Sequence, residues 1–275
     1  MTGVTELDTG TDQLLTRIED GVAVVTFNRP EVRNALGDVV SPALRRMIAR
    51  LRDEPAARCV VVTGAGTAFC SGGDVKGMGE GARRETLPSV EEVIRDQTER
   101  QQALTGALYA LPKPTIAALP GPAAGAGLSI ALACDLRIAA ESAFVTTGFA
   151  NIGLSGDYGA SFFLTQLVGT ATARELFLTA ERVDAARCER LGIVNRVVPD
   201  AQLMDETLEL ARRLARGPTV AYGMMKANLD RAMREDLPTC LGEEARGTVR
   251  TARTEDHREA VRAFVAKRPP KFEGR

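Results

Sequence analysis

Short apolar runs alternate with stretches of helical apolar spacing over residues 1–200. Consecutive apolar, often β-branched residues predict buried strands, and apolar residues that recur with the period of a helix predict helices. The predicted strands span 22–27, 59–63, 115–119, 136–139 and 193–198. The predicted helices span 38–51, 90–111, 125–134, 161–168 and 171–180. This alternation is typical of an α/β domain with right-handed crossovers.

The pattern changes near residue 200, after which no strand is predicted. Helices are predicted over 204–214, 219–233, 240–251 and 255–266. We therefore divide the chain into an α/β core, residues 1–200, and a helical C-terminal region, residues 201–275. About 75 residues of helix are few for an independent core, so we expect this region to pack on the core or on a neighbouring subunit.

The composition narrows the classes of function. The formal net charge is −1, so no overall field attracts nucleic acid or an acidic membrane. Residues 1–12 do not resemble a signal peptide, and no apolar stretch is long enough to span a bilayer. Five scattered cysteines without a C-x-x-C pair argue against disulfides and zinc and favour a cytoplasmic location. The single histidine, His257, excludes multi-histidine metal sites.

Two glycine-rich segments, 68–74 and 121–127, each follow a predicted buried strand. Small residues let main-chain N–H groups approach a ligand, and two such groups, one of them at a helix N-terminus, can hold a developing oxyanion. A dinucleotide-binding loop is disfavoured, because Phe69 and Ile130 stand where the third glycine of that motif is required. Glycine-rich turns are common, however, so the two segments by themselves leave a purely structural role open.

In their order and spacing, several segments resemble the enoyl-CoA hydratase/isomerase (crotonase) superfamily over nearly the whole chain. They are 28–36, 63–74, 114–135, 167–169 with 173–176, 191–198 and 267–270. The resemblance implies a crotonase-like spiral core of stacked ββα turns, followed by helices that form a homotrimer or a dimer of trimers. It implies an acyl-CoA thioester substrate, with coenzyme A as part of the substrate and no metal or redox cofactor.

The resemblance also implies where the oxyanion donors lie. The two main-chain N–H groups would be those of Ser71 and Ala126. Ala126 falls in the first turn of a predicted helix, where N–H groups lack intrahelical partners. The two donors would polarise the thioester carbonyl and stabilise the enolate that forms when a neighbouring proton moves.

The chain departs from the hydratases of this family at two positions. Hydratases carry two glutamates that position and activate water, and here those positions hold Ser129 and Phe149. Addition of water across a conjugated double bond needs a base for the water and an acid for the α carbon. Serine and phenylalanine supply neither group, so hydration by the usual mechanism is not expected.

One acid remains in the right region, Asp157, at the place where the single catalytic carboxylate lies in the enoyl-CoA isomerases that the chain resembles. A 1,3-proton shift needs only one base, and an apolar pocket would raise the pKa of that carboxyl. Leu154, Tyr158, Phe162 and Phe163 are expected to make the pocket. Alternatively, Asp157 is the N-cap of the helix that follows.

The resemblance implies further contacts to coenzyme A and the acyl group. Arg29 and Arg33 are expected to meet phosphates, although Arg33 is equally well explained as a helix cap or a solvated side chain. Asp74 and Lys76 would lie near the adenine, and Lys267 would contribute from the C-terminal tail. The remaining candidate substrate contacts are Cys70, Gly72, Gly125, Ser129, Phe149 and Tyr158.

Isomerisation of an enoyl-CoA is thus the favoured activity, and three alternatives stay open. The first is a hydratase with a rearranged site, in which Tyr158, Ser129 or Glu80 positions water, with residues 77–88 acting as a lid. The second is an acyl-CoA-binding protein without turnover. The third, an RNA-binding protein, would need a basic face that the charge balance does not support. The dehalogenase branch is disfavoured because the chain contains no tryptophan.

Overall fold

The computed structural model describes residues 3–74 and 88–275. Its largest element is a sheet in the strand order β1-β2-β3-β4-β5-β7-β10, and a smaller sheet has the order β6-β8-β9. The large sheet consists of β1 (Thr5–Glu6), β2 (Leu14–Glu19), β3 (Val22–Phe27), β4 (Cys59–Gly64), β5 (Thr115–Leu119), β7 (Leu136–Ala140) and β10 (Arg196–Val198). The small sheet consists of β6 (Ala123–Ala124), β8 (Phe144–Thr146) and β9 (Val183–Asp184).

The sheet changes from antiparallel to parallel at β3. Strands β2 and β3 form a hairpin whose turn, Asp20 and Gly21, has positive φ at both residues (51° and 79°), as two-residue hairpin turns require. Strands β3, β4, β5, β7 and β10 are parallel neighbours. β4 and β5 are buried along nearly their whole length, which explains why both read as continuous apolar runs.

Strand β2 is missing from the sequence-based prediction. Its burial alternates between buried and exposed residues, because one face of this outer part of the sheet meets solvent. A search for continuous apolar runs does not detect such a strand, whereas a search for period-two alternation does.

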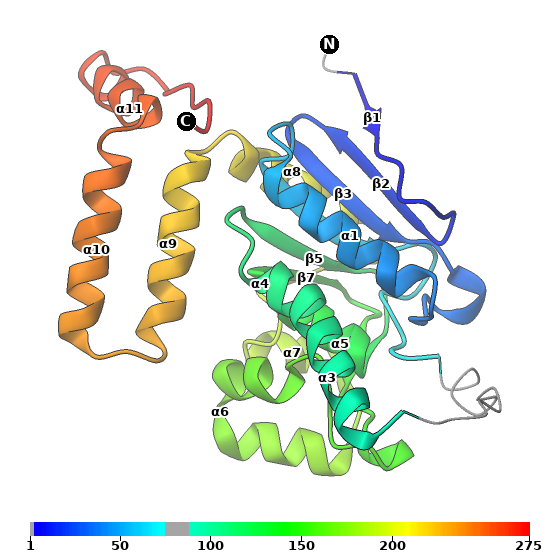
Figure 1. Ribbon diagram of the computed structural model, residues 1–275. Helices are drawn as coiled ribbons and strands as arrows, with labels where there is room; N and C mark the ends of the chain where they lie inside the picture. The colour runs from blue at the N-terminus through cyan, green and yellow to red at the C-terminus, as the bar shows by residue number, and fades with distance from the viewer. Residues whose placement is uncertain (1–2, 75–87) are drawn as a thin grey trace.

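Helices cover the sheet and carry the loops at its edge (Figure 1). They are α1 (Val40–Asp53), α3 (Val90–Gln101), α4 (Ala107–Tyr109), α5 (Ala126–Leu132), α6 (Ala160–Thr179), α7 (Ala185–Arg190) and α8 (Leu203–Ala215). Between α3 and α4, residues Gln102–Gly106 form a π-helix, so the single helix predicted over 90–111 has a change of winding inside it. Helix α6 joins two predicted helices across a kink at Gly169 (φ 74°). Short 3₁₀ turns span Pro30–Val32, Ala150–Ile152 and Asp200–Gln202.

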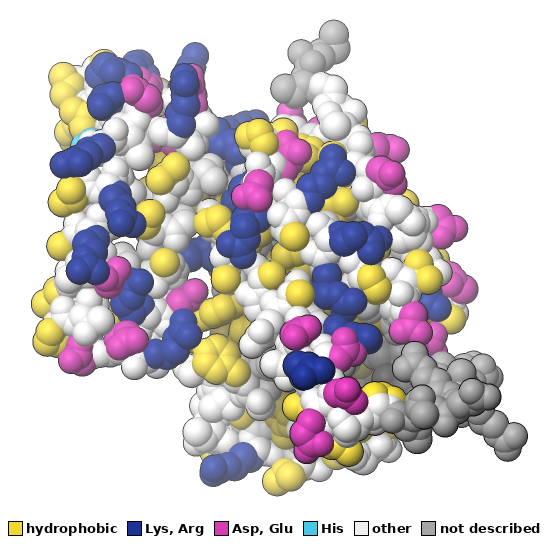
Figure 2. Space-filling view, viewed as in Figure 1, with side chains coloured by type: hydrophobic (Ala, Val, Ile, Leu, Met, Phe, Trp, Pro, Cys, Tyr) yellow, Lys and Arg dark blue, Asp and Glu magenta, His cyan; other side chains and the backbone are white. Residues whose placement is uncertain are grey.

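The C-terminal helices divide into two groups. Helix α8 packs directly on strands of the large sheet. Helices α9 (Thr219–Ala232) and α10 (Leu237–Thr251) form a hairpin that projects beside the core, and α11 (Glu255–Val265) lies at one end of it (Figure 1). Hydrophobic side chains line the outer edge of this hairpin (Figure 2). Those exposed on α10 include Leu237, Leu241 and Val249, whereas Met225 and Leu229 of α9 line a cavity between the hairpin and the core.

Among the described residues, no helix is both long enough and apolar enough to cross a bilayer.

Candidate active site

The two glycine-rich segments meet at one edge of the large sheet. Residues 68–74 follow β4 and residues 121–127 follow β5, and these strands are parallel neighbours, so both turns emerge at the same end. The N–H of Cys70 donates to the carbonyl of Pro122 at 3.2 Å. A Cβ atom on Gly127 would lie 2.3 Å from the carbonyl oxygen of Cys70, so only glycine permits this approach. The predicted juxtaposition of the two turns is therefore present.

Within the first turn, the amide of Ser71 is already engaged. Its N–H donates to the carbonyl of Arg33 at 3.0 Å. The next amide, that of Gly72, faces the thiol of Cys70 and lowers its pKa, against the larger effect of burial. Neither of these two amides is free to meet a ligand in this structure.

The amide of Gly73 is different. The N–H of Leu36 donates to the carbonyl of Gly72 at 2.7 Å, and the N–H of Asp74 donates to the carbonyl of Leu36 at 2.9 Å. Because main-chain groups alternate in direction along an extended segment, the N–H of Gly73 points away from Leu36. It has no acceptor among the described residues. The amide of Gly73, rather than the expected amide of Ser71, is therefore the candidate donor of this turn.

The second donor candidate, Ala126, lies at the first position of α5, where an N–H has no intrahelical acceptor. No acceptor for it is found elsewhere in the described part of the chain. Gly125, the residue before it, has φ 51°. A Cβ atom on Gly72 would lie 3.6 Å from the nitrogen of Ala126 and 2.8 Å from the carbonyl oxygen of Ala124. The free amides of the two turns thus belong to segments in direct contact.

Asp157 lies in the loop that leads into α6. The N-cap of α6 is Gly159, and no side chain caps this helix, so the alternative role of Asp157 as an N-cap is wrong. Burial raises the pKa of the Asp157 carboxyl to about 6. Its Oδ1 atom is buried and has no hydrogen-bond partner among the described residues. A half-buried carboxyl with an unpaired, buried oxygen has no evident structural purpose and is available to react with a ligand.

Side chains from two helices hold the backbone at Asp157. The Oγ of Ser129, on α5, donates to the carbonyl of Asp157 at 3.0 Å. The N–H of Tyr158 donates to the Oε1 of Gln101, at the end of α3, at 2.8 Å. Ser129 thus supports the candidate acid rather than replacing it, and its position at the site was predicted. Gln101 was not singled out, because nothing in its local sequence distinguishes it from Gln102.

Phe149 lies between the second turn and the Asp157 loop. Its ring would be 3.7 Å from a Cβ atom on Gly125 and 3.8 Å from one on Gly156. It stacks on Phe177 with ring centroids 6.0 Å apart. Phe149, which stands where the resemblance led us to expect a glutamate in a hydratase, therefore lies between the two segments and contributes apolar surface.

The expected apolar pocket is confirmed only in part. Tyr158 and Phe163 are buried, and the Phe163 ring lies beside Gly159. Leu154 and Phe162 are 49% and 39% exposed, so neither is enclosed around Asp157 in a single chain. Phe162 instead packs against Phe163 at a centroid distance of 5.5 Å.

Among the expected contacts to coenzyme A, Arg29 and Asp74 form one cluster. The guanidinium of Arg29 donates to the carbonyl of Ala35 at 2.6 Å and lies 3.5 Å from the carboxylate of Asp74. Both line a cavity of about 310 Å³ beside the first turn, together with Gln13, Leu36, Gly37, Asp38 and Val39. Arg33 is exposed, with a left-handed backbone (φ 52°), and its side chain is available to solvent.

Two expected contacts, those of Cys70 and Lys267, do not bring their side chains to the site within one chain. The thiol of Cys70 is buried and its pKa is raised to about 12 by burial, so only its backbone contributes. Lys267 follows α11, which lies far from α5 in the same chain (Figure 1). Lys76, Glu80 and most of the expected lid, residues 77–88, lie outside the described residues.

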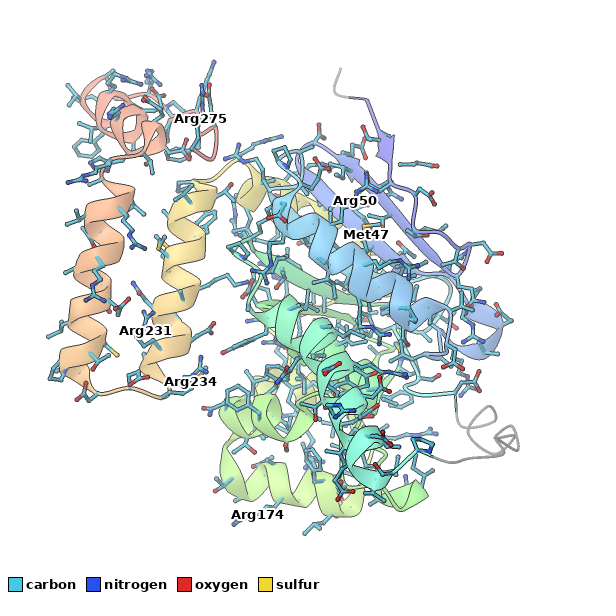
Figure 3. All side chains as sticks on the ribbon, viewed as in Figure 1. Met47, Arg50, Arg174, Arg231, Arg234 and Arg275 are labelled. Carbon is cyan, nitrogen blue, oxygen red and sulfur yellow. The ribbon has the colours of Figure 1, made fainter. Side chains whose placement is uncertain are left out.

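The distribution of charged side chains on the surface agrees with the formal net charge of −1. On the face shown in Figure 2, basic and acidic side chains are interspersed. Arg174, Arg231 and Arg275 lie on separate parts of the molecule (Figure 3), and the last two form ion pairs with Glu243 and Glu273. This face offers no continuous basic strip of the kind that nucleic acid requires. The described residues also contain no group of histidine, cysteine, aspartate and glutamate suited to a metal ion.

Comparisons with known proteins extend over nearly the whole chain. A model of the enoyl-CoA hydratase/isomerase family matches residues 17–275. A Rhodobacter capsulatus protein named "Probable enoyl-CoA hydratase" is 41% identical, covering 94% of this chain and 96% of its own. The 1,2-epoxyphenylacetyl-CoA isomerase of Escherichia coli is 35% identical, covering 95% and 98%. The crystal structure of an enoyl-CoA hydratase from Polaromonas sp. JS666 superposes with a TM-score of 0.86 at 33% identity, covering 94% and 99%.

Proposed function

The chain belongs to the enoyl-CoA hydratase/isomerase family, and from this premise we propose that it moves the double bond of an enoyl-CoA thioester, with Asp157 as the only proton carrier. The crotonase-like α/β core expected from the motifs is confirmed. Hydratases and an isomerase both occur among the relatives, so the choice between the two reactions depends on the residues of this chain.

The observation that carries the proposal is the carboxyl of Asp157, whose buried Oδ1 atom has no partner among the described residues. Asp157 is half-buried, its Oδ1 atom is buried and unpaired, and burial raises the pKa of its carboxyl to about 6. The two positions where hydratases hold glutamates carry Ser129 and Phe149, and both lie beside the same turn. One base near neutrality suits a proton shift, whereas addition of water needs a second acid–base group.

The oxyanion donors would act first. The thioester oxygen would accept from the amides of Gly73 and Ala126, which have no acceptor within the described residues. Both amides are fixed by the backbone before substrate arrives, so no reorganisation is needed when negative charge develops on that oxygen. Removal of a single donor of this type typically costs about 3 kcal/mol of transition-state stabilisation.

Asp157 would then move the proton. In a 3-enoyl-CoA, the carboxylate takes a proton from the α carbon, and the electron pair of that C–H bond forms a dienolate whose charge rests on the thioester oxygen. The neutral carboxylic acid returns the same proton to the γ carbon, and the double bond ends between the α and β carbons. Atoms and electrons balance without any further reactant, so we propose that coenzyme A enters as part of the substrate and that no cofactor is needed.

Coenzyme A would bind beside the first turn. The cavity next to Arg29 and Asp74 supplies polar groups there, and Arg33 is exposed nearby. Since Lys267 lies far from α5 in its own chain, we expect it to reach only coenzyme A bound to another copy. The exposed apolar edge of the α9–α10 hairpin supports assembly into the proposed trimer or dimer of trimers.

The direct test follows the absorbance of the conjugated enoyl thioester. We expect 3-hexenoyl-CoA to gain this absorbance with the wild-type protein, and Asp157→Asn to lower that rate about a thousandfold, the range of general acid–base catalysis. Asp205→Asn, at an exposed position on α8, is the matched control and keeps the wild-type rate.

Crotonyl-CoA separates the alternatives in the same assay. Rapid loss of its absorbance, equal in wild type and Asp157→Asn, would show hydration by other groups and overturn the proposal. Stabilisation by CoA thioesters against heating without any turnover would instead identify a binding protein.

A further inference from the structure

The peptide unit that joins Asp157 to Tyr158 is held on both sides by side chains of other helices. Its carbonyl accepts from the Oγ of Ser129 at 3.0 Å, and its N–H donates to the Oε1 of Gln101 at 2.8 Å. Because a peptide unit is a rigid plane, two bonds at its opposite ends fix its rotation about the chain. The two bonds thereby hold the backbone at Asp157 in place, and the carboxyl projects from that backbone.

The backbone needs such support at this point. Tyr158 has φ 51°, a left-handed conformation that costs a residue with a Cβ about 1–2 kcal/mol. Gly156 and Gly159 on either side also have positive φ, 112° and 81°. Without the bond to Gln101, rotation of the peptide unit would relieve the strain at Tyr158. A strained conformation persists only where the surroundings hold it in place.

Gln101 occupies a special position on its own helix. It is the last residue of α3, immediately before the π-helix Gln102–Gly106. A π-helix shifts the residues before and after it relative to one another, and such segments occur frequently at functional sites. The Oγ of Thr105 donates to the carbonyl of Gln101 at 3.3 Å, so the backbone of Gln101 is held as well.

We propose that Gln101 is a positioning residue, which orients the carboxyl of Asp157 toward the substrate by holding the amide of Tyr158. This inference rests on the proposed role of Asp157 as the proton carrier. Gln101 need not touch the substrate, and Ser129 acts on the other side of the same peptide unit.

The charged groups around this turn are few. The phenol of Tyr158 is influenced by Asp157, by Arg45 of α1 and by Arg100 of α3, while burial is the dominant influence on its pKa. For Asp157 itself, burial is the cause of the raised pKa. A new charge at position 101 would therefore be felt at Asp157 with little competition from existing neighbours.

Two substitutions at Gln101 test the proposal against a matched control. Gln101→Leu removes the acceptor at similar volume, whereas Gln101→Glu keeps an acceptor oxygen and adds a negative charge. Gln102→Leu, at the exposed neighbouring glutamine, is the control. We expect Gln101→Leu to lower kcat for 3-hexenoyl-CoA about ten- to a hundredfold, with a much smaller change in KM, because a misplaced catalytic group loses rate rather than binding.

The Gln101→Glu variant should keep most of kcat, with the acidic limb of its pH profile moved to higher pH, since a nearby negative charge disfavours ionisation of Asp157. A residue 101 that does not lie against the Asp157 turn would leave this limb unmoved. If Gln101→Leu does not fold, Gln101→Glu carries the test, and an unmoved limb overturns the proposal.

Hydrogen exchange provides a readout that does not depend on turnover. Gln101→Leu should speed amide exchange in residues 155–160, and Gln102→Leu should not. Unchanged exchange there, or a Gln101→Leu variant with wild-type kcat, would overturn the role of Gln101. Full activity of Asp157→Asn would instead overturn the proposed function, while the exchange experiment would still decide whether Gln101 holds the turn.

Discussion

The turns that carry Gly73 and Ala126 present main-chain amides, whereas the loop that carries Asp157 presents a side chain, and the two are held differently. The two glycine-rich turns follow buried parallel strands. Main-chain hydrogen bonds and close contacts at glycines join one turn to the other. The Asp157 loop is held by the side chains of Ser129 and Gln101. Main-chain geometry survives most substitutions, while an arrangement of side chains is easily altered.

This difference suggests a division of labour within the site. The amides of the two turns would recognise the thioester oxygen, which all acyl-CoA substrates share. The side chains at positions 129, 149 and 157 would decide where a proton goes and whether water is activated. A family with one fold and several reactions is expected to keep the first part and vary the second.

The main-chain part of the site, the amides of Gly73 and Ala126, is tested most directly by the substitution Ala126→Pro. Proline is tolerated at the first position of a helix, because the N–H it lacks has no partner within the helix. We expect kcat to fall about a hundredfold through loss of one oxyanion donor. Ala126→Gly keeps the amide and serves as the control, with a rate near that of wild type. Equal rates in the two variants would remove Ala126 from the oxyanion hole.

The side-chain part of the site, the carboxyl of Asp157, is tested by the pH dependence of kcat. A base must be ionised to take a proton, so the rate should fall as pH drops below about 6, the pKa to which burial raises Asp157. Below that pH, kcat should decline about tenfold for each further pH unit. The measurement is a pH profile of kcat between pH 4.5 and 8 with 3-hexenoyl-CoA, with unfolding monitored in parallel. A flat profile through this range would show that Asp157 is not the base.

A smaller effect on stability is expected from the same carboxyl. The folded pKa of Asp157 lies above the unfolded value, so its contribution to stability is present at low pH and is lost as pH rises through about 6. A shift of this size corresponds to at most about 3 kcal/mol, and the partial exposure of the side chain reduces it to about 1 kcal/mol.

Asp157→Asn removes this cost, since an amide has no charge to bury. We expect the variant to be more stable than wild type above pH 7 by about 1 kcal/mol, and to lose that advantage near pH 4. Denaturant unfolding at the two pH values measures the difference. A variant less stable than wild type at pH 8 would mean that the carboxylate has a partner that stabilises its charged form.

The sequence predicted the central strands well. Both faces of each of these strands are buried, so each strand is a continuous run of apolar residues. β3 and β5 have the predicted bounds, whereas the outer strand β2 alternates and was missed. The glycine-rich segments were recognisable because close approach of the backbone admits only small side chains there. Gly127, against the carbonyl of Cys70, is such a position.

The sequence could not show which amides are free. Ser71, Gly72 and Gly73 are adjacent small residues, and only the pairing of Leu36 with this segment leaves the Gly73 amide open. Nor could it separate a helix cap from a catalytic acid at Asp157. That distinction depends on whether α6 begins at Asp157 or beyond it, and helix ends are poorly defined by sequence.

By itself, the sequence determined the α/β core, the glycine-rich turns and the absence of glutamate at positions 129 and 149, because these follow from residue type and local pattern. The tertiary structure alone decided that the Gly73 amide is open, that the Oδ1 atom of Asp157 is buried without a partner in the described part of the chain, and that Gln101 contacts the turn beside it. Hydrogen bonding and burial at a site arise from segments far apart in the chain, and only folding brings those segments together.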